Sequence, residues 1–218
     1  MPTKVTITTL DWVPEFAHGY VRDIRIRWAL EEIGRPYDVD TVPVQEKTPE
    51  HFSRQPFGQV PMLKDGDLSL FESGAILLHL SEDTALMPVG DDRARTVQWL
   101  IAGLNSVEPY MMQWAIAKFF DEDEAAAARF EKSLRERLSM LQDALAERDW
   151  LVDRDFTVAD LFMADILRIP AANGMLDDLP KLAAYVERAT ARPAFGRAMT
   201  DHMAHWHAAD AKKAAASA

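Results

Sequence analysis

The sequence predicts a mixed α/β domain of the thioredoxin-like type followed by an all-helical domain. Two observations lead to this fold class. Over residues 1–82, β-branched stretches alternate with helical patterns, whereas the apolar residues of 93–208 keep helical spacing throughout. Residues 83–92, which contain a proline and a glycine, predict a linker between the two domains. The small, polar residues 209–218 predict a disordered tail.

The start of the chain predicts a βαβ unit. Residues 4–10 alternate and are β-branched, as is typical of a strand. A loop with a proline and a glycine follows, and apolar residues at helical spacing then predict a helix over 21–34, with Gly34 as its C-cap. Residues 37–44 predict the second strand.

A hairpin and a helix complete the first domain. Asp65-Gly66 is a strong signal for a two-residue hairpin turn. Pro61 cannot donate to a ladder, so it belongs at a strand start, an edge or a bulge. The helix that follows the hairpin is expected to be capped by Glu72 or Ser73. The order βαβ, ββ, α predicts a small mixed sheet with helices on its faces.

Pro61 also suggests a binding site. If the Val60–Pro61 bond is cis, the N–H and C=O of Val60 point away from the ladder, and such a free edge suits an extended peptide. Glu72 and Ser73 stand at a helix start, where unpaired N–H groups and the helix dipole favour anions. A carboxylate for an amine and donors for a carboxylate together predict a small zwitterionic peptide as the ligand.

The second domain predicts several long helices. Pro109 predicts a kink or break in the first of them. Thr157 and Asp160 have the spacing of a capping box, with Asp in place of Glu or Gln. We interpret this pair as structural rather than catalytic, with a stability effect of about 1 kcal/mol or more.

Composition excludes several classes of partner. The net charge is −11, and the chain contains no cysteine. The acidic balance argues against nucleic acid and against anionic membranes. Without cysteine, a disulfide, a protein thiolate and a cysteine metal site are excluded. The N-terminus lacks the pattern of a signal peptide, and no apolar run has the length of a membrane span, so we expect a soluble cytoplasmic protein.

Three motifs in this order resemble the glutathione transferase family over the whole chain: QVPML…FESGAI, LMP…RARTVQWL and DFTVADLFMADI. The resemblance implies glutathione as co-substrate, without a metal, and a homodimer. It implies that Val60, next to cis-Pro61, pairs with the cysteinyl backbone of glutathione. It further implies that Glu72 and Ser73 hold the γ-glutamyl head and that Lys47 binds the glycyl carboxylate. Gln59 would assist in binding either the γ-glutamyl head or the backbone.

The sequence departs from the family at the thiol-activating residue. Family members usually place a Tyr at the end of the first strand, or a Ser or Cys at the start of the first helix. Here those positions hold other residues, and three candidates remain. Tyr20 could donate its hydroxyl to the sulfur, and Arg22 could lower the thiol pKa or bind a carboxylate. Trp12 has an indole N–H, but at a strand end such a residue is more often a packing residue or pocket wall. Loop N–H groups are a further alternative.

The second substrate is expected between the domains. Tyr110, Met111 and Trp114 stand on the first long helical stretch and suit a small hydrophobic electrophile, although a helix–helix core is an equally good interpretation. His202 and His205, with His207, have spacings a metal could use but lack nearby carboxylates, so no metal site is expected.

The leading hypothesis is therefore a glutathione transferase that acts in detoxification, by attack of the glutathione thiolate on a hydrophobic electrophile. The alternatives are a non-catalytic glutathione-binding or chaperone-like protein of the same fold and another glutathione-dependent enzyme, such as an isomerase, a dehalogenase or a peroxidase.

Overall fold

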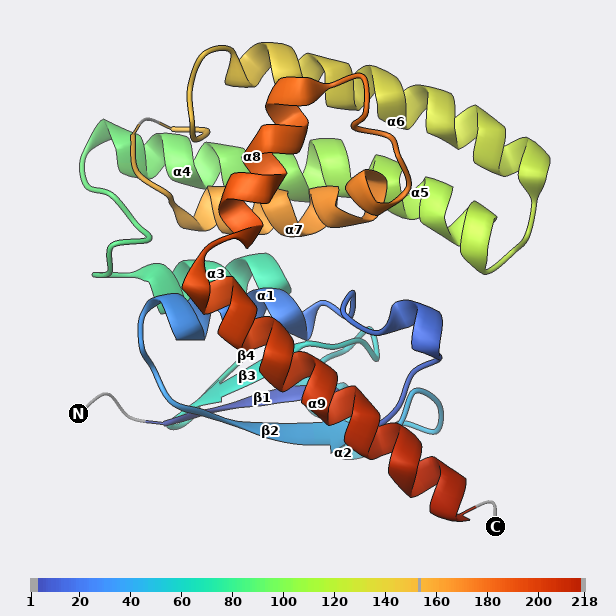
Figure 1. Ribbon diagram of the computed structural model, residues 1–218. Coiled ribbons are helices and arrows are strands. Elements are labelled where there is room, and N and C mark those ends of the chain that lie inside the picture. Colours follow the sequence, from blue (N-terminus) through green and yellow to red (C-terminus); the bar gives the residue numbers. More distant parts are fainter. Residues whose placement is uncertain (1–3, 153, 217–218) are drawn as a thin grey trace. The chain divides into compact units, whose positions relative to one another are not determined.

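A four-stranded mixed sheet forms the centre of the first of two structural units (Figure 1). The computed structural model describes residues 4–152 and 154–216. The strand order is β2-β1-β3-β4, with β1 and β2 parallel and the other pairs antiparallel. The strands are β1 (Val5–Leu10), β2 (Tyr37–Val42), β3 (Met62–Asp65) and β4 (Leu68–Phe71). The predicted βαβ unit and hairpin are confirmed.

Two helices, α1 (Asp23–Glu32) and α3 (Ser73–Ser81), cover one face of this sheet (Figure 1). The short segments of the unit are η1 (Glu15–Ala17) and α2 (Pro49–Arg54). Gly34 has a φ of +64°, which is the left-handed conformation that ends a helix most easily when the residue is glycine. The C-cap itself is Ile33, one residue before the predicted position, and Gly34 follows it in the left-handed conformation.

The last helix, α9 (Pro193–Ala216), packs against α1 and belongs to the first unit, which runs to Glu82 and resumes at Arg192. Its buried face includes His202 and Trp206, both 0% exposed. The sequence had predicted a helical domain that continues to residue 208 and a disordered tail from 209. The structure differs on both points, because α9 buries its apolar face on α1 and stays helical to Ala216. Residues 217 and 218 of the predicted tail lie outside the described residues.

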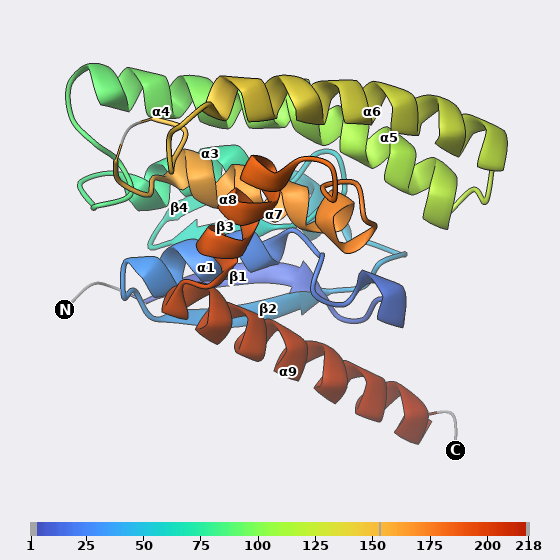
Figure 2. The same ribbon diagram turned by 45° about the horizontal axis from the view of Figure 1, so that its top comes forward.

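The second unit, Asp83–Ala191, is helical. Its helices are α4 (Asp91–Ala102), η2 (Gly103–Val107), α5 (Glu108–Phe119), α6 (Glu124–Leu145), α7 (Val158–Ala172) and α8 (Pro180–Thr190). Helices α5 and α6 lie side by side (Figure 2), while α7 is apolar nearly all round and forms the core. Pro109 stands in the first turn of α5, directly after the π-helical segment η2. The α-helix is therefore interrupted just before the proline, but the chain stays helical from α4 to α5 and does not break.

Gly103 lies where η2 approaches α7. A Cβ at this position would lie 2.8 Å from Cδ1 of Phe162, whose side chain is 0% exposed. We therefore expect Gly103→Ala to lower the free energy of unfolding by about 1 kcal/mol, because overpacking outweighs the gain in helix propensity. Gly196 of α9 is the matched control, since a Cβ there meets nothing within 4 Å, and Gly196→Ala should stabilise by about 0.5 kcal/mol. Urea unfolding measures both, and equal effects of the two substitutions would contradict the prediction.

Asp65, at the end of β3, makes the fold sensitive to acid. Arg35 Nη2 donates to Asp65 Oδ1 at 2.6 Å, and His79 Nε2 lies 2.8 Å from Oδ2. The hydrogen bond from Arg35, helped by His79 and opposed by burial, holds the pKa of Asp65 below its ordinary value. A carboxylate with a depressed pKa stabilises the fold above its unfolded pKa of about 3.9, and this contribution is lost as the pH falls through the lower, folded value.

Asp65→Asn should therefore lower the free energy of unfolding by about 1 to 2 kcal/mol at pH 7. The difference from wild type should stay constant down to about pH 4 and shrink below it. Urea titrations at several pH values test this, with the exposed Asp67→Asn as control. If the difference in the free energy of unfolding between wild type and Asp65→Asn were the same at pH 3 and pH 7, the assigned role of Asp65 would be ruled out.

Candidate functional site

The sheet register brings the predicted glutathione-binding residues to one end of the sheet. Strands β1 and β2 both finish there, with Leu10 paired to Val42. At the same end β3 begins, since Met62 pairs with both Thr8 and Phe71. Val60 and Pro61 therefore lie just outside the paired part of β3, at this end of the sheet. The loops after β1 and β2 thus start beside the segment that carries Val60 and beside the start of α3.

The Val60–Pro61 bond is cis, as the family resemblance implied. Pro61 is buried and β3 begins one residue later, at Met62, so Val60 precedes the ladder. Gln59 is exposed and Val60 is half-buried. That this main-chain edge takes up an extended peptide as one short strand stays a prediction.

Glu72 and Ser73 form the turn between β4 and α3. Glu72 occupies the N-cap position with a φ of +67°, which is unfavourable for a residue with a side chain. Its side chain makes no capping hydrogen bond, so the expected side-chain cap is not formed by Glu72. The Glu72 carboxylate is exposed, and Ser73 beside it is only 5% exposed. A strained residue at a helix start is typical of binding sites.

Arg25 connects this turn to α1. Its Nη1 donates to Ser73 Oγ at 3.2 Å, and the arginine is 3% exposed. Because Ser73 Oγ accepts this hydrogen bond, its own proton is free to be donated to a ligand. The sequence reading missed Arg25, since charged residues in a helical pattern are usually solvated. The available signal was that Arg25 and Arg27 interrupt an otherwise apolar stretch from Ile24 to Leu30.

The candidate thiol-activating residues lie in the segment between β1 and α1. Tyr20 is 37% exposed, and Arg22 holds the N-cap position of α1. The contact of Arg25 with Ser73 sets the first turns of α1 and α3 side by side. Trp12 is half-buried and bonds to Asp210 of α9, as described below.

Lys47 lies close to the segment that leads to Val60. Its Cδ would be 3.6 Å from a Cβ at Gly58, and its Nζ donates to the carbonyl of Val44 at 2.5 Å. His51 is buried nearby. Burial first, and then the Lys47 ammonium, lower the pKa of His51, while the main chain of Gln59 acts in the opposite direction.

The candidate electrophile residues stand on α5. Met111 and Trp114 are 2% and 3% exposed, and Trp114 packs edge-on against Phe119 at 5.4 Å between ring centroids. Tyr110 is half-buried, and its hydroxyl accepts from Arg137 Nη2 of α6 at 2.9 Å. The assignment of these residues to a substrate pocket stays a prediction.

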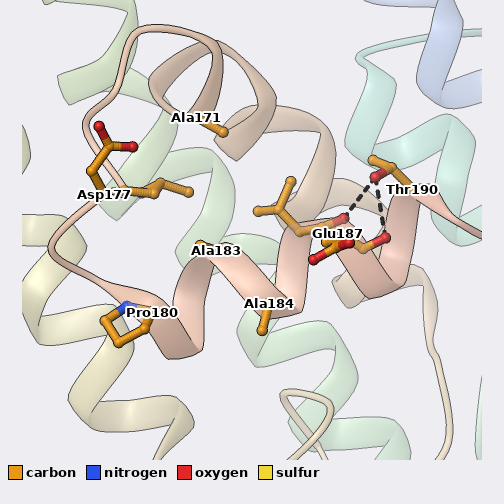
Figure 3. Close-up of a pocket in the computed structure, with 9 residues that line it drawn as sticks. Ala171, Asp177, Pro180, Ala183, Ala184, Glu187 and Thr190 are labelled. Atoms are coloured by element: carbon orange, nitrogen blue, oxygen red, sulfur yellow. Dashed lines mark hydrogen bonds between the residues drawn. The ribbon is translucent and has the colours of Figure 1, made fainter.

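A surface groove of about 600 Å³ lies elsewhere in the helical unit, between α7 and α8 (Figure 3). Small side chains such as Ala171 and Ala183 line it. The Thr190 hydroxyl at its edge donates back to the carbonyls of Val186 and Glu187. None of the predicted site residues lines this groove.

Two of the histidines considered for a metal connect α9 to other segments of the first unit. His202 is buried with Nδ1 3.8 Å from Asp23 Oδ2, and His205 donates to the Leu10 carbonyl at 3.0 Å. Within residues 4–152 and 154–216, no group of three or more His, Cys, Asp or Glu could hold a metal ion. In the same residues, no helix is both long enough and apolar enough to cross a bilayer.

Two family models match the chain. The glutathione S-transferase N-terminal domain covers residues 16–82, and the glutathione S-transferase C-terminal domain covers residues 104–193. Glutathione S-transferase 4 of Zea mays is 30% identical over 182 residues, which cover 76% of this chain and 82% of the relative. The chain belongs to the glutathione S-transferase family, and the family resemblance of its motifs is confirmed.

Solved structures agree with this assignment. A glutathione transferase family member from Pseudomonas fluorescens, with two glutathione molecules bound, has a TM-score of 0.78 and is 25% identical, over 89% of this chain and 92% of that one. The glutathione transferase URE2P6 of Phanerochaete chrysosporium, in complex with oxidised glutathione, shares the fold with a TM-score of 0.80, 22% identity and coverage of 92% and 97%.

Proposed function

We propose that this protein is a glutathione transferase that transfers the glutathionyl group to a small hydrophobic electrophile. The observation that carries the proposal is the buried hydrogen bond from Arg25 to Ser73. This bond links α3 to α1. The start of α3 is expected to bind the γ-glutamyl head, and the first residues of α1 are expected to activate the thiol. Relatives of the same fold that have glutathione bound support glutathione as the ligand.

Glutathione would lie extended along the edge before β3. Val60 offers its N–H and C=O to the cysteinyl unit, with Gln59 beside it. Ser73 and the N–H groups at the start of α3 bind the γ-glutamyl carboxylate, and the Glu72 carboxylate pairs with the ammonium. Lys47 reaches the glycyl carboxylate. Each contact matches one group of the tripeptide with a partner of opposite hydrogen-bonding role or charge.

Thiol activation is assigned to Tyr20 or Arg22. A free thiol has a pKa of about 8.5, so it is largely protonated at neutral pH. A hydroxyl from Tyr20 or the charge of Arg22 stabilises the thiolate, and the thiol proton leaves to solvent. The thiolate then attacks the carbon of the electrophile, which releases its leaving group or takes up a proton. The homodimer and the identity of the electrophile stay predictions.

The ultraviolet difference spectrum of bound glutathione, titrated from about pH 5 to 9, tests the proposal. We expect thiolate at pH 7 in the wild type, and a rise of about one pKa unit in either Tyr20→Phe or Arg22→Ala. Tyr37→Phe is the hydroxyl control, since Tyr37 bonds to Asp201 of α9. Tight binding without thiolate below pH 8 would instead identify a non-catalytic glutathione-binding protein.

A further inference from the structure

The buried face of α9 continues beyond its apolar part onto the loop after β1. His202, Trp206, Asp210 and Lys213 follow one another at spacings of three or four residues, so they share one helix face. His202 and Trp206 are buried, whereas Asp210 is half-buried and Lys213 is exposed. The last two of these residues therefore add polar groups where the core contact with α1 ends.

Both polar groups engage Trp12. The indole Nε1 of Trp12 donates to Asp210 Oδ1 at 2.8 Å. Lys213 Nζ lies 3.0 Å from the centroid of the Trp12 ring, as in a cation–π contact. The indole is thus held both at its edge and over its face by two residues one helical turn apart.

Other contacts hold the same loop. His205 donates to the carbonyl of Leu10 at 3.0 Å, directly before the loop. His18 stacks on Trp206 with 5.7 Å between ring centroids, and its Nε2 lies 3.9 Å from Asp210 Oδ2. The loop from Asp11 to Arg22 is therefore held by α9 at its beginning and at His18, two residues before Tyr20.

We propose that Asp210 and Lys213 are positioning residues, which hold Trp12 and so keep the loop of residues 11–22 in the conformation that activates the glutathione thiol. This inference rests on the proposed function, because that loop carries Tyr20 and Arg22. A hydroxyl or guanidinium stabilises a thiolate only within hydrogen-bond reach, so a loop that moves loses activation. Val60, Glu72 and Ser73 lie outside the loop, and glutathione affinity should change little.

The test compares Asp210→Ala, Lys213→Ala and their double variant with two controls. Asp210→Asn keeps an acceptor for the Trp12 N–H, so this variant should keep the thiol pKa and the kcat of the wild type. Lys212→Ala removes an exposed lysine beside the same site and should behave as wild type. The measurements are hydrogen exchange of the peptide over residues 11–22, the thiolate titration of bound glutathione, its Kd, and kcat with a model aryl halide.

For Asp210→Ala and the double variant, we expect faster exchange in residues 11–22 and a higher thiol pKa. The value of kcat at pH 7 should fall about tenfold, as for the loss of one charge-assisted hydrogen bond, whereas Kd measured at about pH 5, where the thiol is protonated, should change less than twofold. Unchanged thiolate titration in these variants overturns the inference, whether or not exchange becomes faster. A wild type that binds glutathione without forming thiolate overturns the proposed function itself, and the inference falls with it.

Discussion

Asp160→Ala is expected to lower the free energy of unfolding by about 3 to 5 kcal/mol, the largest effect on stability that we predict. The Asp160 side chain is 0% exposed, and its two oxygens accept four hydrogen bonds. The donors are Leu151 N at 2.8 Å, Thr157 N at 2.9 Å, Thr157 Oγ1 at 2.8 Å and Tyr185 OH at 3.1 Å. Alanine would leave these buried donors unsatisfied.

The matched control is Asp123, which caps α6 by accepting from Ala126 N at 2.9 Å. Asp123 is exposed, so Asp123→Ala should cost only about 1 kcal/mol, since water replaces the lost partner. Urea unfolding, followed by circular dichroism at pH 7, compares the two. A loss no larger for Asp160→Ala than for Asp123→Ala would show that burial adds nothing to this cap.

Glu72→Gln is expected to raise the Kd for glutathione about 10- to 100-fold, because it removes the charged partner of the γ-glutamyl ammonium. Isothermal titration calorimetry measures this, with Asp67→Asn as a control for the loss of one negative charge in the same unit. An unchanged Kd in Glu72→Gln would remove Glu72 from the binding site.

Glu72→Gly separates binding from backbone conformation. Glycine adopts a φ of +67° without steric cost, so it should relieve about 1 kcal/mol of strain while it also removes the carboxylate. We expect this variant to be at least as stable as wild type and to bind glutathione as weakly as Glu72→Gln. The combination would show that the strain at Glu72 is maintained for the ligand.

Local patterns were sufficient for much of the fold. Asp65-Gly66 predicted the hairpin, and Pro109 predicted an interruption of the α-helix before α5. Both predictions were possible because each residue acts through its own backbone conformation. The capping box of Thr157 and Asp160 is confirmed for the same reason. The resemblance added the cis bond at Pro61.

Contacts between distant segments were not predictable in this way. The periodicity of α9 shows which face is apolar, but not which surface that face meets. The prediction therefore assigned the helix to the second domain, whereas Arg192 makes a bidentate ion pair with Glu32 of α1. The contact of Arg25 with Ser73 was missed likewise, since 48 residues separate the pair.

The return of α9 to the first unit also sets the order in which the two units are completed during synthesis. Every residue of the helical unit has been synthesised when Ala191 is added, whereas the sheet unit still lacks the helix whose Phe195 packs against Trp28 of α1. Domains fold as units during synthesis. The helical unit is therefore the first to be complete, whereas the sheet unit is complete only once α9 has been synthesised.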